Sequence, residues 1–477
     1  MANRGNFSGR LGFILAAAGS AVGLGNIWRF PYLAGENGGA IFLLVYLCCI
    51  FLLCYPVMVG EIAIGRAANS DAYGSYSKLG GKKWGYLGLF GILAGILILS
   101  FYNVVAGWAF GYFLHISFGD LLNHESFGGF FGEYVNDILD LSSLGGIANS
   151  NLVFSLVFMC LTALIVSQGI QKGIEASNKI MMPSLYAILI GIIIYSLTLP
   201  NASSGVKFYL IPDFSELKIQ TLVDGLKQAF FSLSLGMGAL ITYGSYFNKK
   251  ENITSSAAII SIADTSVAFV SGLMVFPLVH FLAFKLNINP QEIGTSGPPL
   301  IFVVLPQIFY EMGPVLGRVI GGSFFLLVCF AALTSTVSLL EVPVAYLVDQ
   351  KKWNRKRVVW LMALIIFVCG LPSMISQGMI PALNNLPFYR GQDFLTFIAD
   401  MSDICLTVGG CLMSIFISRR WGIHSMDAEL EQGNAHYMKS RVRIFLHVTL
   451  KWIAPILLGV LSIIIILEKF FGIENLI

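Results

Sequence analysis

Apolar stretches of about 20 residues follow one another along almost the whole chain, separated by shorter polar segments. At about 1.5 Å per helical residue, such a stretch is long enough to cross the hydrocarbon core of a bilayer. The stretches lie roughly at 11–34, 40–64, 86–115, 151–170, 176–199, 225–247, 254–285, 315–348, 357–375, 392–418 and 443–470. The pattern therefore predicts an all-α polytopic membrane protein with eleven transmembrane helices.

Two of these stretches carry a polar, glycine-rich interruption near the middle. The first contains GSAVGLGNIWRFP at 19–31, and the sixth contains FFSLSLGMGALITYGSY at 230–246. Irregular backbone is tolerated at membrane depth only where it is buried in protein or lines a cavity. Broken helices five stretches apart are typical of an inverted repeat of five helices plus five, with a binding site at the breaks. We expect the first repeat at 11–199, the second at 225–418 and an additional helix at 443–470.

The composition agrees with this class, because 56% of the residues are hydrophobic and 12% are charged. A net charge of +3 is too small to indicate nucleic-acid binding. Basic residues gather in alternate loops, as in QKKWNRKR at 350–357, whereas the segment 119–150 has acidic residues and no Lys or Arg. The positive-inside rule then places a short N-terminal segment, 1–10, in the cytoplasm and the C-terminus outside, in the plasma (inner) membrane.

Enzymatic function is not predicted, because the sequence has no HExxH, GxSxG or GxxxxGK[ST] motif and offers no catalytic constellation. Asp264, about ten residues into the seventh stretch, is instead a candidate binding residue, since an intramembrane carboxylate usually marks a site. Asn26 and Ser232 could add neutral oxygens, the ligands that a hard cation such as Na⁺ prefers. Thr334 and Ser335 in the eighth stretch are a weaker signal, because such hydroxyls often bond to their own helix.

Charged residues near the ends of the stretches suggest two gates. Arg29 and an aspartate of the tenth stretch, Asp400 or Asp403, could close an outer vestibule, and Arg4 with Asp349 could close the cytoplasmic side. Each pair is equally compatible with a static ion pair. A further segment, 173–183, has a helix-breaking residue at each end and could unwind at the cytoplasmic start of the fifth stretch.

Three segments resemble a known family. They are RLGFILAAAGSAVGLGNIWRFPYLAGENGGAIF (10–42), FSLSLGMGALITY (231–243) and FAALTSTVSLLEVPVAYL (330–347). They are similar to the neurotransmitter:sodium symporters, and especially to bacterial amino-acid transporters with eleven spans and the LeuT-type fold. This fold is an established example of broken helices and inverted repeats.

The resemblance implies a site for each ligand. It implies substrate contacts at Ala21, Gly23, Leu24, Gly25, Ile98, Tyr102, Phe231, Ser232, Ser234, Met237, Ser335 and Leu339. It implies one Na⁺ site at the Ala21 carbonyl, Asn26, Ser232, Asp264 and the substrate carboxylate, and a second at the Gly19, Val22 and Ala331 carbonyls with Thr334 and Ser335. It implies an outer gate of Arg29 and Asp403, an inner gate of Arg4, Ser245, Tyr246 and Asp349, and support of the sixth helix by Glu61.

Two departures refine the expected function. Members that carry monoamines have an aspartate where this chain has Gly23, which favours an amino acid that brings its own carboxylate. Chloride-dependent members have a serine where this chain has Ala268, and Asp264 supplies a fixed negative charge instead. We therefore expect a chloride-independent, Na⁺-coupled amino-acid symporter with two Na⁺ sites, and the apolar residues Ile98, Phe231, Met237 and Leu339 favour a large hydrophobic or aromatic substrate.

Two alternatives stay open at this point. A proton-coupled or sodium-independent transporter of the same fold would use Asp264 as a titrating group, and Na⁺-dependent uptake separates it from a symporter. A non-transporting sensor or an ion channel would accumulate no labelled substrate in proteoliposomes. The expected partners are the amino acid, Na⁺ and the lipid bilayer, and the sequence does not specify an oligomeric state.

Overall fold

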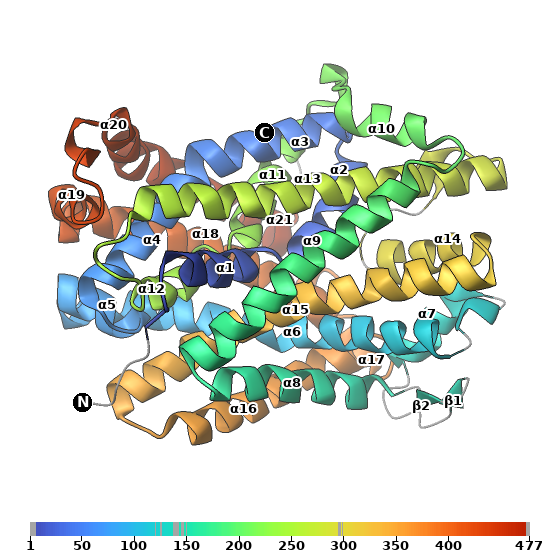
Figure 1. The fold of residues 1–477 in the computed structure, drawn as a ribbon, viewed down its shortest axis with the longest axis horizontal. Helices are drawn as coiled ribbons and strands as arrows, with labels where there is room; N and C mark the ends of the chain where they lie inside the picture. The colour runs from blue at the N-terminus through green and yellow to red at the C-terminus, as the bar shows by residue number, and fades with distance from the viewer. Residues whose placement is uncertain are drawn as a thin grey trace.

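The computed structural model describes residues 6–119, 121–124, 126–136, 143–144, 147–148, 150–293, 297 and 299–473 of the 477-residue chain. In this part of the chain almost every regular element is a helix, as the apolar pattern predicts, and Figure 1 shows the helices gathered in one bundle. The exception is a two-stranded antiparallel ribbon formed by β1 (Ser143–Leu144) and β2 (Ile147–Ala148). Most of the acidic segment 119–150 otherwise lies outside the described residues.

The helices of the first half are α1 (Arg10–Ala21), α2 (Phe30–Glu36), α3 (Ala40–Cys49), α4 (Tyr55–Ala68), α5 (Ala72–Gly80), α6 (Gly85–Ser117), α7 (Phe127–Asn136), α8 (Asn151–Ser167), α9 (Ala176–Ser196) and α10 (Ala202–Leu210). The helices of the second half are α11 (Ile219–Ser232), α12 (Ala239–Gly244), α13 (Ile253–Leu286), α14 (Leu305–Glu311), α15 (Pro314–Lys351), α16 (Arg355–Ile375), α17 (Pro381–Asn384), α18 (Phe394–Ile415), α19 (Ile423–Glu431), α20 (Arg441–Val448) and α21 (Ala454–Phe471). Wider π-helical turns join several of them, including Gly25–Arg29 before α2 and Ile50–Cys54 between α3 and α4.

Eight continuous helices of the described chain are long and apolar enough to cross a membrane. A ninth span is formed by Arg10–Ala21 and Gly25–Glu36, which are bent by 49° at the predicted break. The fourth stretch forms a helix of 17 residues, and the sixth is divided between α11 and α12. The polytopic class is confirmed, whereas the exact number of eleven spans stays a prediction.

The broken segments lie in the interior, between the long helices. Figure 1 shows α6, α13 and α15 running along the long axis of the molecule, with the short α1 and α12 between them in this view. Helix α1 contacts α9, α13 and α15, and α12 contacts α4 and α15. Both breaks are therefore enclosed by apolar helices, where their free backbone groups need partners within the protein.

Candidate functional site

The first break begins where Val22 adopts extended backbone (ψ 104°) directly after α1. Its free backbone groups are bonded by side chains of other helices. The Leu24 amide donates to the Tyr102 hydroxyl at 2.8 Å, and Gln228 Nε2 donates to the Gly25 carbonyl at 2.7 Å. The break is thus a fixed irregular segment whose backbone groups face α6 and α11.

The second break follows α11 and contains three residues with positive φ, namely Ser234 (55°), Gly236 (83°) and Gly238 (74°). Glycine adopts this conformation at little cost, which explains how the sequence LGMG ends one helix and starts the next. A Cβ at Gly236 would also overlap the Leu406 backbone of α18. The Gly236 amide donates to Glu61 Oε1 at 2.6 Å, so a carboxylate of α4 holds this break.

The two breaks share a cavity with α6 and α15. The lining residues are Ser20, Ala21, Gly23, Gly25, Ile98, Tyr102, Phe231, Ser232, Ser234, Met237, Ser335 and Leu339. All the predicted substrate contacts except Leu24 line it, and Leu24 reaches its edge through the bond to Tyr102. The sequence analysis did not single out Ser20, although it lies inside the interrupted segment.

The cavity is lined by both polar and apolar side chains. Gly23 leaves space beside the polar lining, because a Cβ there would lie 2.6 Å from the Tyr102 hydroxyl and would overlap Ser335 Oγ. The apolar lining consists of aliphatic, thioether and aromatic side chains, those of Ile98, Met237, Leu339 and Phe231. This combination suits a small molecule with one charged end and one hydrophobic end.

A buried polar cluster around the carboxylate of Asp264 adjoins the cavity at the first break. Asp264, which is fully buried, accepts hydrogen bonds from Asn26 Nδ2 at 2.8 Å and Ser232 Oγ at 2.9 Å through Oδ1, and from the Tyr46 hydroxyl at 3.1 Å through Oδ2. Asn26 Oδ1 meanwhile accepts from the Gly23 amide at 3.0 Å. The cluster joins one carboxylate to the hydroxyl oxygens of Ser232 and Tyr46, and turning the Asn26 amide would add its oxygen; such an all-oxygen set fits a hard monovalent cation.

A second group of oxygens lies between the first break and α15. Thr334 Oγ1 donates to the Ala331 carbonyl at 2.9 Å and reaches the Val22 carbonyl at 3.3 Å. The neighbouring Ser335 Oγ donates to the Ser20 carbonyl at 3.3 Å. The described residues therefore bring together the broken helix and the hydroxyl pair of α15, and these neutral oxygens also fit a hard cation.

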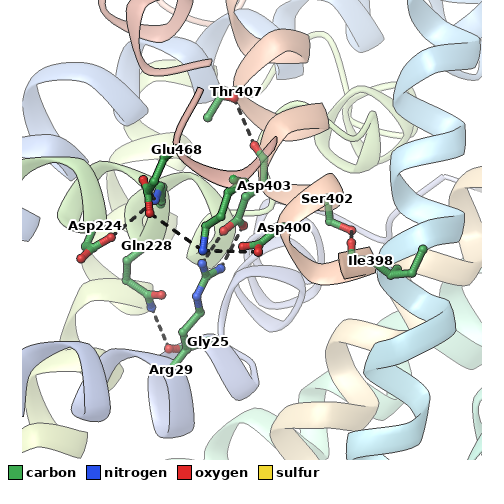
Figure 2. A network of polar contacts seen from close by, with 12 residues as sticks. Gly25, Arg29, Asp224, Gln228, Ile398, Asp400, Ser402, Asp403, Thr407 and Glu468 are labelled. Atoms are coloured by element: carbon green, nitrogen blue, oxygen red, sulfur yellow. Dashed lines mark hydrogen bonds and ion pairs between the residues drawn. The ribbon is translucent and has the colours of Figure 1, made fainter. Parts of the chain in front are cut away.

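A nearly buried ion pair lies next to Phe231, which lines the cavity. Arg29 binds Asp403 of α18 in a bidentate arrangement, with nitrogen–oxygen distances of 3.0 and 2.5 Å (Figure 2). The Arg29 guanidinium also lies 4.7 Å from the centre of the Phe231 ring, which lines the cavity below it. Both residues of this pair were predicted as a gate, and the cation–π contact couples the pair to the cavity wall.

Further charges extend this ion pair to the last helix. Lys469 of α21 lies 3.3 Å from Asp400, and Lys227 of α11 lies 3.7 Å from Glu468 of α21 (Figure 2). Tyr389 also donates to Asp400 at 2.6 Å. Sequence reasoning missed this network because its members are far apart in the chain and no spacing connects them.

The opposite end of the bundle holds the residues predicted as an inner gate, except that Arg4 lies outside the described residues. Asp349 accepts from the Asp71 amide at 3.0 Å, Ser245 Oγ donates to the Thr242 carbonyl at 2.6 Å, and the Tyr246 hydroxyl donates to Glu341 at 3.0 Å. Besides these bonds, Glu341 forms a bidentate ion pair with Arg355.

Glu341 and Arg355 were both missed by the sequence analysis. Arg355 belongs to the basic run at 350–357, which the sequence analysis interpreted only as a sign of cytoplasmic location. That interpretation gave no reason to look for Glu341 as its partner. Its guanidinium also donates to the Val166 carbonyl at 2.9 and 3.1 Å, which joins α8, α15 and α16 at this end.

A separate charged cluster joins α19 to α20. Asp427 accepts hydrogen bonds from Tyr437 at 2.9 Å, Arg443 at 3.0 Å and His447 at 2.9 Å. Burial alone would raise the pKa of Asp427, but these hydrogen bonds and the nearby positive charge bring the pKa below its ordinary value of 3.8. The cluster fixes the hairpin before the last long helix.

Comparisons with known proteins agree on one family. The model of the sodium:neurotransmitter symporter family matches residues 4–127 and 122–472. A sodium-dependent transporter of Bacillus subtilis, YhdH, is 36% identical over 433 residues, which are 90% of each chain. The sodium-dependent serotonin transporter of Drosophila melanogaster is 28% identical over 412 residues, covering 79% of this chain and 65% of that protein. The crystal structure of MhsT in complex with L-phenylalanine matches with a TM-score of 0.85 and 42% identity, over 97% of this chain and 99% of that one.

Proposed function

Because the chain belongs to the sodium:neurotransmitter symporter family, a family of transporters and not of enzymes, we propose that it is a Na⁺-coupled symporter of large hydrophobic or aromatic amino acids. The observation that carries this proposal is the cavity at the two helix breaks, with the Asp264 cluster beside it. The complex of MhsT with L-phenylalanine supports the aromatic substrate class, since that protein is similar over almost its full length.

The substrate is held by its charged end at the first break. Its carboxylate accepts hydrogen bonds from the amides of Leu24 and Gly25 and from the hydroxyl of Tyr102. In doing so it replaces the Tyr102 oxygen, to which the Leu24 amide donates at 2.8 Å. Amides at the start of a helical segment favour such an anion. The hydrophobic side chain then packs against Ile98 and Phe231 of the apolar lining.

Two Na⁺ ions travel with the substrate. The first is held by the Ala21 carbonyl, Asn26, Ser232 and Asp264, together with the substrate carboxylate. A shared carboxylate makes binding reciprocal, because each ligand raises the affinity for the other by the same factor. The second is held by carbonyls of Gly19, Val22 and Ala331 and by the hydroxyls of Thr334 and Ser335, between the broken helix and α15.

We propose that transport does not require chloride. Asp264 supplies a fixed negative charge at the first cation site, and Ala268, one helical turn later on α13, offers no hydroxyl. The charge of the bound cation is therefore balanced by the protein itself.

Transport proceeds by alternating access across the plasma (inner) membrane. We place the N-terminal segment 1–10 in the cytoplasm and the Arg29–Asp403 pair on the outer side, in agreement with the distribution of basic loops. The helices of 11–199 and 225–418 form the two inverted repeats, and the helix at 443–470 is added to them. Opening of the outer pair admits ligands, and opening at Tyr246 and Asp349 releases them.

The test is uptake of labelled L-phenylalanine by proteoliposomes that contain the full-length chain. A Na⁺ gradient should drive accumulation, and choline in place of Na⁺ should abolish it. Accumulation driven by a pH gradient in choline would instead identify a proton-coupled transporter in which Asp264 titrates. No accumulation under either gradient, for any of the twenty amino acids, would contradict transport and leave a sensor or a channel.

A further inference from the structure

Asn178 is a fully buried amide on α9, a helix that packs against both α1 and α15. Its Nδ2 donates to the Ile174 carbonyl at 2.8 Å, whereas its Oδ1 has no hydrogen-bond partner among the described residues. Since a carbonyl can only accept, turning the amide around would bring two oxygens together and lose the bond. The bond to Ile174 therefore fixes Oδ1 on the opposite side.

On that side Oδ1 lies against Gly19 of α1, close to Thr334. A Cβ built on Gly19 would overlap Asn178 Oδ1 and would lie 3.4 Å from Thr334 Cβ, so the three residues meet at one point. Thr334 in turn bonds the carbonyls of Val22 and Ala331. An amide oxygen without a partner among the described residues thus lies at Gly19 and near Thr334, two residues of the proposed second cation site.

Close packing of two helices does not account for this arrangement. Gly19 allows α9 to approach α1, and a Cα–H contact to Oδ1 is a weak interaction. A small apolar residue at 178 would allow the same approach without burying an acceptor that has lost its hydration. A cation beside Oδ1 removes this penalty.

Building on the proposed Na⁺ coupling, we propose that Asn178 Oδ1 is an additional ligand of the second Na⁺. Asn178 Oδ1 would join the carbonyl oxygens and the Thr334 and Ser335 hydroxyls already proposed for this site. The cation then joins three elements, α1, α15 and α9. Because the Ile174 carbonyl in the preceding π-helical turn holds the amide, loss of that turn would withdraw one ligand.

The experiment is a Na⁺ titration of the thermal unfolding temperature of the purified full-length protein, without substrate and with choline keeping the ionic strength constant. Asn178→Ala should raise the Na⁺ concentration at half-effect about tenfold, the effect of losing one charge-assisted contact. Asn178→Ser removes the amide oxygen and keeps a small polar side chain whose hydroxyl can donate to the Ile174 carbonyl, so it should raise that concentration by a similar factor.

Asn103 provides the matched control. It is also a buried amide that donates to a carbonyl, that of Ser155 at 3.0 Å, and its Oδ1 is also without a partner among the described residues. Asn103→Ala removes the same chemical group away from the second site and should leave the Na⁺ titration unchanged.

The outcomes separate this proposal from the proposed function. A wild-type titration curve for Asn178→Ala overturns the role of Asn178 and leaves Na⁺ coupling intact. If Asn178→Ala does not fold, Asn178→Ser decides, and an unchanged midpoint overturns the role. If Na⁺ does not stabilise the wild-type protein at all, both proposals fall.

Discussion

Asp264→Asn tests the charge on which the proposed first cation site depends. The side chain is fully buried and accepts hydrogen bonds from Asn26, Ser232 and Tyr46. The substitution keeps the shape but removes the negative charge and turns one acceptor into a donor. At a separation of about 4 Å and an effective dielectric constant of about 20, the lost attraction for a monovalent cation is about 4 kcal/mol. An amide oxygen still contributes as a neutral ligand, so we expect Na⁺ affinity to fall by about 100-fold to 1,000-fold.

The assay is Na⁺-dependent binding of labelled L-phenylalanine to the purified protein, read by scintillation proximity. Asp213→Asn is the control, because this carboxylate is exposed and bonds only its neighbour Ser215 among the described residues. A Na⁺ midpoint within about twofold of wild type for Asp264→Asn would refute the reasoning. The same charge argument predicts that wild-type uptake is equal in chloride and in gluconate, and a steep loss in gluconate would contradict it.

Three further predictions follow from single contacts. Arg29→Gln leaves the Asp403 carboxylate unpaired and should speed dissociation of bound L-phenylalanine at least about tenfold in a chase experiment, whereas an unchanged rate would mean that the pair is static. Glu61→Ala leaves the Gly236 amide without its acceptor and should cost about 1–3 kcal/mol in unfolding free energy, while Glu61→Gln should cost less; equal losses would exclude this bond as the cause. The pKa of Asp427 is lowered in the folded protein, so its contribution to stability is complete above its ordinary pKa and is lost as the pH falls through the lowered value. The unfolding temperature of Asp427→Asn should therefore depend less on pH below about 4 than that of the wild type.

The sequence predicted the features that depart from the uniformly apolar pattern of membrane helices. Glycines and polar residues inside apolar stretches are conspicuous, so both breaks, at 19–31 and 230–246, are recognisable from the order of residues alone. Asp264 is recognisable for the same reason. The positions of Ile98, Met237 and Leu339 in one cavity came from the family resemblance, since an apolar residue on an apolar helix carries no signal of its own.

Contacts between segments that are distant in the chain could not be predicted from the sequence. Nothing in the spacing of Glu341 and Arg355, or of Lys469 and Asp400, shows that these charges pair. The helix α14 between the seventh and eighth stretches was also missed, because it is too short to register as a span. The orphan oxygen of Asn178 depends on the side-chain orientation set by Ile174, which no residue pattern encodes.

The backbone of the two breaks has a consequence for how this site can be studied. Six of the groups that we propose as ligands are main-chain atoms: the carbonyls at 19, 21, 22 and 331 and the amides at 24 and 25. Side-chain mutagenesis cannot remove a main-chain atom, so an alanine scan of 19–25 would report on shape and leave the ligands in place. Replacing single peptide bonds by esters would delete one amide donor and weaken one carbonyl at a time, and would measure the contacts that the genetic code cannot alter.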